Sequence, residues 1–393
     1  KWAIIEDSIS SNLDLTKHND IIYESSYYIT PLKTEAGLSH LFYVKIKNKN
    51  DLTKLETLAS INNVEIMGSN RFMPLWYTLS CTKDSKGDAL NMANLFFETG
   101  LFDASEPDLM TDDMLSCTND TYFSNQWALS NTGQNGGTSG IDINFCQARQ
   151  ITTGDQYIVI AVFDKGFEMD HPDLTNVFSE SYDTDSGTSP ALVYGIHGTA
   201  CAGVIGANSN NNLGVSGIAP DCPLMSISNS FINSPNSQQC RADGFNFAWQ
   251  NGASVISNSW HSSLQYQIID DAIENALENG RNGLGCVIVF AAGNGNSTTI
   301  TYPANSNDNI IVVGALSPCG ERKNSTSCDG ETNWRSNYGD ELDIMAPGVF
   351  IPTTDQQGSN GYNTSTGTAG DYFQDFGGTS AACPHVAAVA GLI

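Results

Sequence analysis

The stretch GCVIVFAA (residues 285–292) is a nearly continuous apolar run, and the turn-forming residues GNGN (293–296) follow it directly. Helical, Gly-terminated segments separate it from four comparable runs, at 157–163, 223–228, 253–259 and 309–316. Strands that are apolar on both faces are typical of a parallel sheet covered by helices on each side. The sequence therefore predicts an α/β domain of three layers built on a parallel sheet.

A smaller unit is predicted before this domain. Its segments are a strand at 41–46, a helix at 51–62, strands at 64–70 and 75–81, a helix at 86–100 and an extended segment at 102–109. This βαββαβ order is that of a small ferredoxin-like α+β domain. The polar segment 110–119 then reads as a linker, so the expected divisions are 1–109, 110–119 and 120–393.

Composition excludes several classes of partner. The chain has 393 residues, a net charge of −26 and 40% hydrophobic residues. Nucleic acid and anionic membranes would repel such a surface, so neither is an expected partner. No apolar run reaches the roughly 18 residues that a membrane span needs, so we expect no integral membrane segment.

The ten cysteines have no metal-binding spacing. Cys319 and Cys328 enclose a polar segment and look like a disulfide-closed loop, and Cys222 and Cys240 similarly flank a polar excursion. This usage favours an oxidising, exported setting.

Four polar residues lie at strand ends or helix starts. Asp164 ends the run at 157–163, His197 begins the small-residue segment HGTACAG (197–203), Asn294 follows the run at 285–292, and Ser380 lies in GGTSAACPHVAA (377–388). Each has an ordinary alternative: a turn Asp or Asn, a surface His, or an N-cap Ser. However, functional groups gather beyond the carboxyl ends of parallel strands, and the order Asp, His, Ser is that of one type of serine protease.

At these residues the sequence resembles the subtilisin-like serine proteases, over about residues 120 to 393. The resemblance implies a serine endopeptidase in which Ser380 attacks the peptide carbonyl, His197 transfers its proton and Asp164 orients His197. It also implies that Asn294 and the Ser380 N–H stabilise the oxyanion. Ala381 departs from the Met that often follows the nucleophile in the family.

The resemblance further implies a substrate-binding segment at VISNSWHS (255–262). The residues expected to contact substrate are Ser259, Trp260, His261 and Gly293. His261 replaces a common Gly and is either a pocket-rim residue or a solvent-facing loop residue. This segment contains no carboxylate that would favour a basic residue before the scissile bond.

A calcium site is implied by NSNNNLGVSGIAP (208–220), which resembles the calcium loop of the family. Hard oxygen ligands suit calcium. The implied ligands are Asp120, Asp173, Ser209, Asn211, Leu213 and Val215. The alternative is a plain Asn-rich turn.

The first unit resembles the propeptide domain of subtilisin-like zymogens, which inhibits its own enzyme, and cleavage is expected within 110–119. The catalytic domain is expected to lack its C-terminal end at Ile393. Two further expectations concern cysteines: a disulfide between Cys81 and Cys117, and a buried Cys201 thiol beneath His197. A cysteine nucleophile at Cys383 with His385 is disfavoured, because residues two apart on a helix point in different directions. The main alternative function is a catalytically silent pseudoprotease or protein-binding module.

Overall fold

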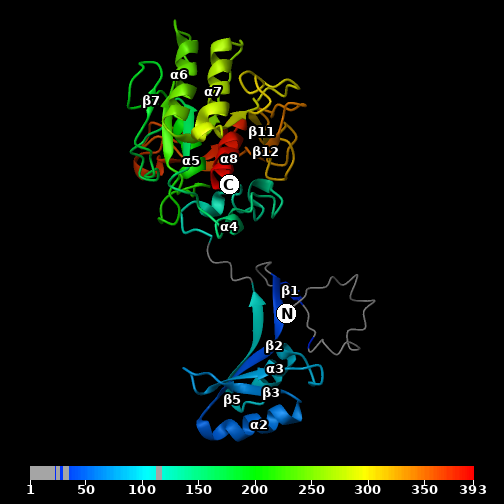
Figure 1. The fold of residues 1–393 in the computed structure, drawn as a ribbon. Helices are drawn as coiled ribbons and strands as arrows, with labels where there is room; N and C mark the ends of the chain where they lie inside the picture. The colour runs from blue at the N-terminus through cyan, green and yellow to red at the C-terminus, as the bar shows by residue number, and fades with distance from the viewer. Residues whose placement is uncertain (1–22, 24–26, 30–34, 112–116) are drawn as a thin grey trace. The chain divides into compact units, whose positions relative to one another are not determined.

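The structure is a computed structural model that describes residue 23 and residues 27–29, 35–111 and 117–393. The chain divides into two compact units, residues 1–115 and 116–393 (Figure 1). This division falls inside the predicted linker, of which residues 112–116 lie outside the described residues. Within the described residues, no helix combines the length and the apolar character that a membrane span requires.

In the described part of the unit of residues 1–115, two α-helices pack with an antiparallel sheet. Its elements are β1 Tyr27–Ile29, β2 Glu35–Ile46, α2 Leu52–Ile61, β3 Glu65–Ser69, β4 Trp76–Ser80, α3 Ala89–Glu98 and β5 Phe102–Thr111. The strands β5, β2, β4 and β3 lie side by side in that order, and β1 pairs with the start of β2. The βαββαβ order expected from the sequence is therefore present.

Aromatic side chains fill the core of this unit. Phe42 of β2 packs edge-to-face on Phe96 of α3 at 5.2 Å between ring centroids, and Phe96 stacks on Phe102 at 5.8 Å. Asp88 caps α3, because its carboxylate accepts a 2.7 Å hydrogen bond from the Asn91 N–H. The helix thus begins where its apolar face reaches the sheet.

The unit of residues 116–393 is built on a seven-stranded parallel sheet. Its elements are α4 Phe145–Ala148, β6 Val159–Asp164, β7 Tyr182–Asp183, α5 His197–Gly206, β8 Leu224–Ser228, α6 Ser237–Gln250, β9 Ala253–Asn258, α7 Gln267–Gly283, β10 Val287–Ala291, β11 Ile311–Leu316, β12 Ile344–Pro347, β13 Ile351–Thr354, β14 Tyr372–Phe376 and α8 Thr379–Leu392. The strand order is β12-β11-β10-β9-β6-β8-β7, and β13 and β14 form a separate antiparallel pair. All five apolar runs predicted as strands are strands of the sheet.

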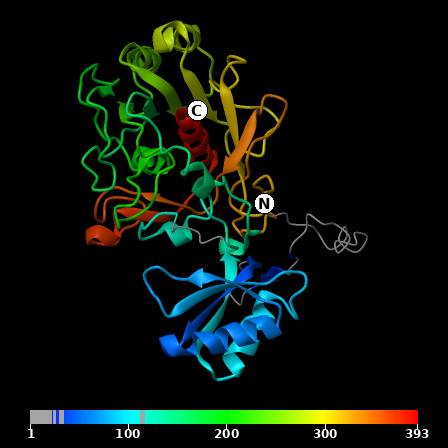
Figure 2. The same ribbon diagram turned by 60° about the horizontal axis from the view of Figure 1, so that its bottom comes forward.

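Helices cover both faces of this sheet, which gives the predicted three layers (Figures 1 and 2). Helices α5 and α8 pack against each other and bury one face, and α6 and α7 cover the opposite face. Small residues dominate α8, so the helix lies close to the strands, and Ala381, Ala382 and Ala388 are fully buried. Fully buried strand residues of both faces explain why the strands read as continuous apolar runs.

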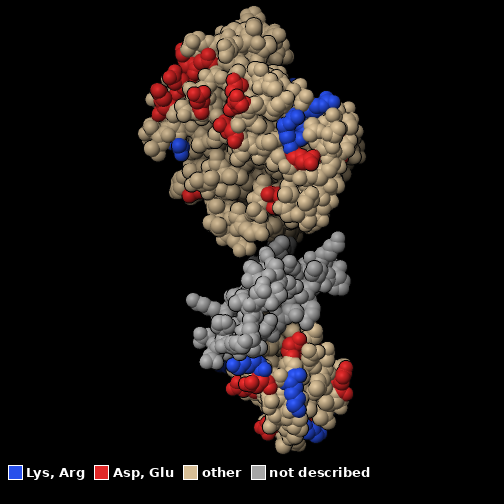
Figure 3. Space-filling view, turned by 90° about the vertical axis from the view of Figure 1, so that its right-hand side faces the viewer, with Lys and Arg blue, Asp and Glu red and all other residues tan. Residues whose placement is uncertain are grey.

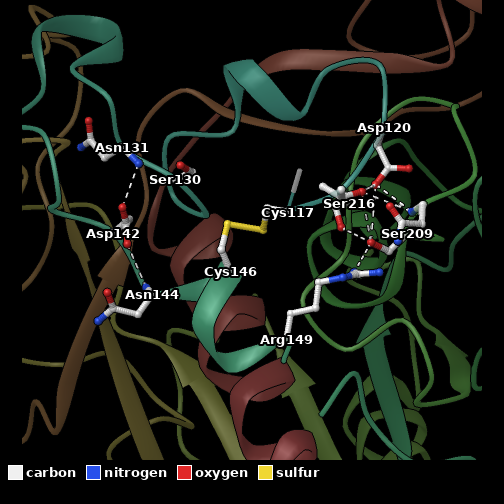
Figure 4. The surroundings of a disulfide bond; sticks show 12 residues. Cys117, Asp120, Ser130, Asn131, Asp142, Asn144, Cys146, Arg149, Ser209 and Ser216 are labelled. Carbon is white, nitrogen blue, oxygen red and sulfur yellow. Dashed lines mark hydrogen bonds between the residues drawn. A yellow bond between two sulfur atoms is a disulfide. The ribbon is translucent and has the colours of Figure 1, made fainter. Parts of the chain in front are cut away.

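The disulfides correct two expectations. Cys319 and Cys328 are bonded as predicted. Cys117, however, is bonded to Cys146 of α4, with Cα atoms 5.2 Å apart (Figure 4), so the predicted Cys81–Cys117 bond is wrong. Cys81 is 1% exposed in the core of residues 1–115, where its thiol packs among that unit's own side chains. Cys222 and Cys240 are also both free and buried, so they do not form a bridge.

The loop closed by Cys319 and Cys328 surrounds a buried lysine. The Lys323 side chain is fully buried, and its Nζ donates to Asp329 Oδ1 at 2.9 Å and to the Asn324 carbonyl at 3.1 Å. Glu331 Oε2 lies 3.4 Å from the same nitrogen. A buried ammonium needs such partners, so this ion cluster determines the shape of the loop.

Candidate active site

Asp164 and His197 form a hydrogen-bonded pair at the carboxyl edge of the sheet. Asp164 is the last residue of β6 and His197 is the first residue of α5. The His197 Nδ1 lies 2.9 Å from both carboxylate oxygens of Asp164. Asp164 is buried, and its Oδ1 also accepts the Lys165 N–H at 2.7 Å. The carboxylate therefore favours the tautomer with hydrogen on Nδ1, which leaves Nε2 free to accept a proton.

The charge of Asp164 controls the protonation of His197. Burial is the largest single influence and would lower the pKa of His197, but the Asp164 carboxylate, together with Cys201, raises this pKa well above the ordinary 6.5. The ring also packs edge-to-face on Phe376 at 5.5 Å between centroids. The imidazole is thus fixed in orientation and supported in its charged form.

Ser380 lies in the same cluster, in the first turn of α8. Its carbonyl accepts a 3.0 Å hydrogen bond from Ser259 Oγ, and its own Oγ lies 3.4 Å from the Ser259 carbonyl. Cys201 Sγ is 3.8 Å from His197 Nδ1 and 3.6 Å from the Ser380 carbonyl. The histidine and the serine therefore both contact the same sulfur atom. Among the described residues no hydrogen bond joins Ser380 Oγ to His197, and such bonds commonly tighten only when substrate binds.

Asn294 is fixed beside Ser380 by Thr379. The Asn294 Oδ1 accepts the Thr379 N–H at 2.9 Å and the Thr379 hydroxyl at 3.1 Å. With Oδ1 committed in this way, the orientation of the side-chain amide is fixed, and Asn294 is an exposed residue. Gly378 has φ +104, a value that L side chains rarely adopt, and a Cβ there would lie 3.2 Å from Asn294 Nδ2. Thr379 was not among the predicted site residues, although its place before Ser380 in GGTSAA was the available signal.

The predicted substrate-binding residues lie around the same edge. Ser259 directly follows β9, and Gly293 follows β10 and donates its N–H to Thr379 Oγ1 at 3.0 Å. His261 is exposed. Trp260 is 8% exposed and packs on Phe163 and Phe290 in the core, so the face it offers to a pocket is small.

The two cysteine expectations near the site are confirmed. Cys201 is buried, and burial raises the pKa of its thiol, so it is a neutral group beneath His197. Asp164, His197 and Cys201 also have ligand-type atoms within 4.8 Å of one another, but the Nδ1 of His197 is already occupied by Asp164. Cys383 is fully buried with a pKa raised by burial to about 12, and His385 bonds the Ala381 carbonyl through Nδ1 at 2.8 Å. Neither therefore faces the site.

Predicted calcium ligands come together in a second cluster, of which Figure 4 shows Asp120 and Ser209. Asp120 Oδ1 accepts the Asn211 N–H at 3.1 Å, and Asp173 Oδ1 accepts from the Asn211 side chain at 2.7 Å. The Val215 N–H donates to Asp173 Oδ2 at 3.2 Å, and Ser209 Oγ lies 3.5 Å from Asp120 Oδ2. One loop thus links two carboxylates that are far apart in sequence.

Both carboxylates in this cluster are buried without a direct ion pair among the described residues, and the nearby Arg149 guanidinium donates to the Ser209 hydroxyl beside Asp120. Asp173 is 0% and Asp120 is 5% exposed, and neither forms an ion pair within residues 35–111 or 117–393. Burial, with the charge of Asp120 adding to it, raises the pKa of Asp173 to about 6. Buried carboxylates are normally paired or bound to a metal, and this set of oxygen donors fits a hard divalent cation.

Comparison with known proteins identifies relatives along this unit. Residues 155–393 match the subtilase family. The calcium-dependent protease of Nostoc sp. is 37% identical over 298 residues, which cover 69% of this chain and 43% of that protein. Thermitase of Thermoactinomyces vulgaris is 32% identical over 235 residues, which cover 60% of this chain and 74% of thermitase. The crystal structure of the serine protease of Aeromonas sobria superposes with a TM-score of 0.59 at 25% identity, covering 70% of this chain and 54% of that one. The chain thus spans less than half the length of the Nostoc relative.

Proposed function

The chain belongs to the subtilase family, and we propose that it is a serine endopeptidase that cleaves peptide bonds with Ser380, His197, Asp164 and Asn294. The observation that carries this proposal is the Asp164–His197 hydrogen bond, with Ser380 and Asn294 at the same edge of the sheet. The relatives named as proteases support the same reading.

The geometry suits acyl transfer. Ser380 Oγ attacks the peptide carbonyl while His197 Nε2 takes its proton, and His197 later returns the proton to the leaving amine. The Asp164 carboxylate stabilises the imidazolium that forms in between. The oxyanion accepts hydrogen bonds from Asn294 Nδ2 and from the Ser380 N–H at the start of α8, where the helix dipole favours negative charge.

We further propose that residues 1–109 are a propeptide that inhibits the enzyme until the chain cuts itself within 110–119. The division of the chain into two units near residue 115 supports a cleavage position in the sequence between them. A cut before Cys117 would leave the Cys117–Cys146 disulfide within the catalytic unit. The new N-terminal segment, with Asp120, would then stay attached to α4.

One mass measurement tests the proposed function. Incubating the chain with calcium should release a fragment that ends between about residues 110 and 119, and the Ser380→Ala variant should remain intact. Ser359→Ala, a change at an exposed serine, is the matched control and should be cut like the wild type. If neither chain is cut and a fluorophosphonate probe does not label Ser380, the function is instead that of a silent binding module.

The buried cluster of Asp120 and Asp173 supports a structural calcium ion. Side-chain oxygens of Asp120, Asp173, Ser209 and Asn211 would hold the ion together with carbonyl oxygens of Leu213 and Val215. When bound, the ion supplies the positive charge that the two carboxylates lack. It takes no part in the cleavage itself.

Calcium removal is expected to destabilise the catalytic unit. In Ser380→Ala, which avoids self-digestion, calcium at 100 times its Kd should add about 2.7 kcal/mol to the free energy of unfolding. Thermal melts with calcium and with excess chelator measure this difference. Asp173→Asn should remove most of the calcium effect, whereas the exposed Asp340→Asn should keep it. An equal melting temperature with and without calcium would contradict the site.

Substrates are proposed to be proteins or peptides, and the setting is proposed to be outside the cytoplasm, which the two disulfides support. On the face drawn in Figure 3, acidic side chains are more widespread than basic ones over residues 116–393. This agrees with the net charge of −26 and argues against a polyanionic partner.

A further inference from the structure

Arg241 of α6 is a buried cation without an anionic partner. Arg241 is only 6% exposed, and its Nη1 donates a hydrogen bond to Gln238 Oε1 at 3.2 Å. Its Nε is buried with no hydrogen-bond acceptor, and no ion pair to Arg241 exists among the described residues. Buried arginines are normally paired, so a partner is missing from this position.

Two aromatic rings enclose the guanidinium. Its Cζ lies 5.6 Å from the centroid of the Phe231 ring and 5.9 Å from that of Trp260. Such contacts hold a guanidinium flat but supply no acceptor for its N–H groups. The Trp260 Nε1 is also buried without a partner. Neighbouring N–H donors without acceptors, one of them on a cation, form a place where an anion would be bound.

This pair of donors is connected to the reacting groups. Phe231 follows β8 and Trp260 follows β9, at the carboxyl edge of the sheet that also carries Asp164 and Asn294. Trp260 is joined to Ser259, whose Oγ donates to the Ser380 carbonyl at 3.0 Å. The aromatic side chains around Arg241 therefore continue the segment expected to contact substrate upstream of the bond that is cut.

Asp185, the described acidic residue whose charge acts on Arg241, has other hydrogen-bond partners. Burial lowers the pKa of Arg241, and the negative charge of Asp185 acts in the opposite direction. However, the Asp185 carboxylate oxygens accept hydrogen bonds from the Asn229 side chain at 2.8 Å and from the Ser230 N–H at 3.3 Å. Arginine stays charged even where burial lowers its pKa. Among the described residues, no carboxylate therefore meets the requirement of Arg241 for an anionic partner.

We propose that Arg241, with Phe231 and Trp260, determines specificity by binding the carboxylate of a Glu or Asp side chain upstream of the scissile bond. The proposal rests on the proposed peptidase function and names its substrate class. The carboxylate would accept charge-assisted hydrogen bonds from the free guanidinium N–H groups. The substrate's aliphatic carbons would lie against the half-buried Phe231 ring, because Trp260 is only 8% exposed. No bond forms or breaks at this position.

The test compares peptides that differ only in whether one side chain is a carboxylate or the corresponding neutral amide. Internally quenched peptides carry either Glu or Gln at each position in turn upstream of the cut, and the calcium-activated full chain is the enzyme. At one position kcat/KM should favour Glu over Gln by about tenfold or more. Arg241→Met should bring this ratio to about one, and Arg241→Lys, which keeps the charge but loses the planar donors, should give an intermediate ratio. Arg281→Met, a change at an exposed arginine of α7, should keep the wild-type ratio.

The ratio of Glu to Gln within each variant is the readout, so a general loss of activity or of folded protein does not imitate the result. A wild-type chain that cleaves the peptides without preferring Glu at any position would overturn the role of Arg241 and leave the peptidase function intact. A preference that survives in Arg241→Met would overturn it equally. A wild-type chain that cleaves none of the peptides would overturn the proposed function itself.

Discussion

Replacing Asp164 by Asn is expected to slow self-cleavage of the chain by about 10⁴-fold. In the wild type, both carboxylate oxygens lie 2.9 Å from His197 Nδ1 and hold the hydrogen on that atom. An amide nitrogen in the same place would donate to Nδ1 and shift the hydrogen to Nε2. An Nε2 that carries hydrogen cannot take the proton of Ser380, so the dominant tautomer is not a base. The residual rate then comes from the minor tautomer with hydrogen on Nδ1, while the shape of the site is kept.

Intact mass followed over time measures the rate of self-cleavage. Because the cut is made within one molecule, inhibition by the retained propeptide does not affect the comparison between the variant and the wild type. The exposed Asp308→Asn is the matched control and should be cut at the wild-type rate. A fall of less than about tenfold in Asp164→Asn would show that Asp164 does not orient the base.

The same variant should move the pH dependence in a defined direction. His197 must be neutral to act as a base, so the rate rises as pH increases through its pKa. Asp164 raises this pKa above 6.5, whereas burial lowers it. Without the charge of Asp164, burial is the largest remaining influence and only Cys201 opposes it, so the midpoint of the pH profile should move to lower pH. An unchanged midpoint, or one at higher pH, would contradict the assigned electrostatic coupling.

The sheet and the two-unit division could be predicted because burial on both faces requires apolar runs. Fully buried β6 and β9 are clear examples. The short strand β7 and the edge strand β12 were not predicted, since β7 has only two residues and Ile344 of β12 is exposed. A short or exposed strand leaves no run of apolar residues to recognise.

Pairings between distant segments could not be predicted from spacing. Cys117 bonds Cys146 of α4, 29 residues further along the chain, and Cys81 is enclosed in the core of its own unit. Arg241 is a similar case, because only the fold places it between Phe231 and Trp260. Asp164, His197, Asn294 and Ser380, the residues predicted for the site, lie at one edge of the sheet, because strand ends and helix starts meet there.

Removing the buried lysine is expected to be the most destabilising change in the catalytic unit. Lys323 is fully buried with Asp329, whose side chain is also fully buried. Lys323→Met would keep much of the packing against Trp334, 5.6 Å from Nζ, but would leave the Asp329 charge buried and unpaired. Breaking such a pair costs about 3–5 kcal/mol. Urea unfolding of the Ser380→Ala chain, followed by tryptophan fluorescence, measures the loss.

A second change separates the lost pair from the lost packing. Lys323→Met with Asp329→Asn has no unpaired charge at Asp329, so its loss of unfolding free energy should be smaller than that of Lys323→Met alone. Lys45→Met breaks an exposed ion pair with Asp103, in which the Lys45 and Asp103 side chains are 37% and 42% exposed. This change should lower the unfolding free energy by about 1 kcal/mol or less. Two results would contradict a stabilising role for the charge of Lys323: a loss of less than about 1 kcal/mol of unfolding free energy in Lys323→Met alone, or a loss in the double variant equal to the sum of the losses in the two single variants. In either case the Cys319–Cys328 disulfide would be the stronger constraint on this loop.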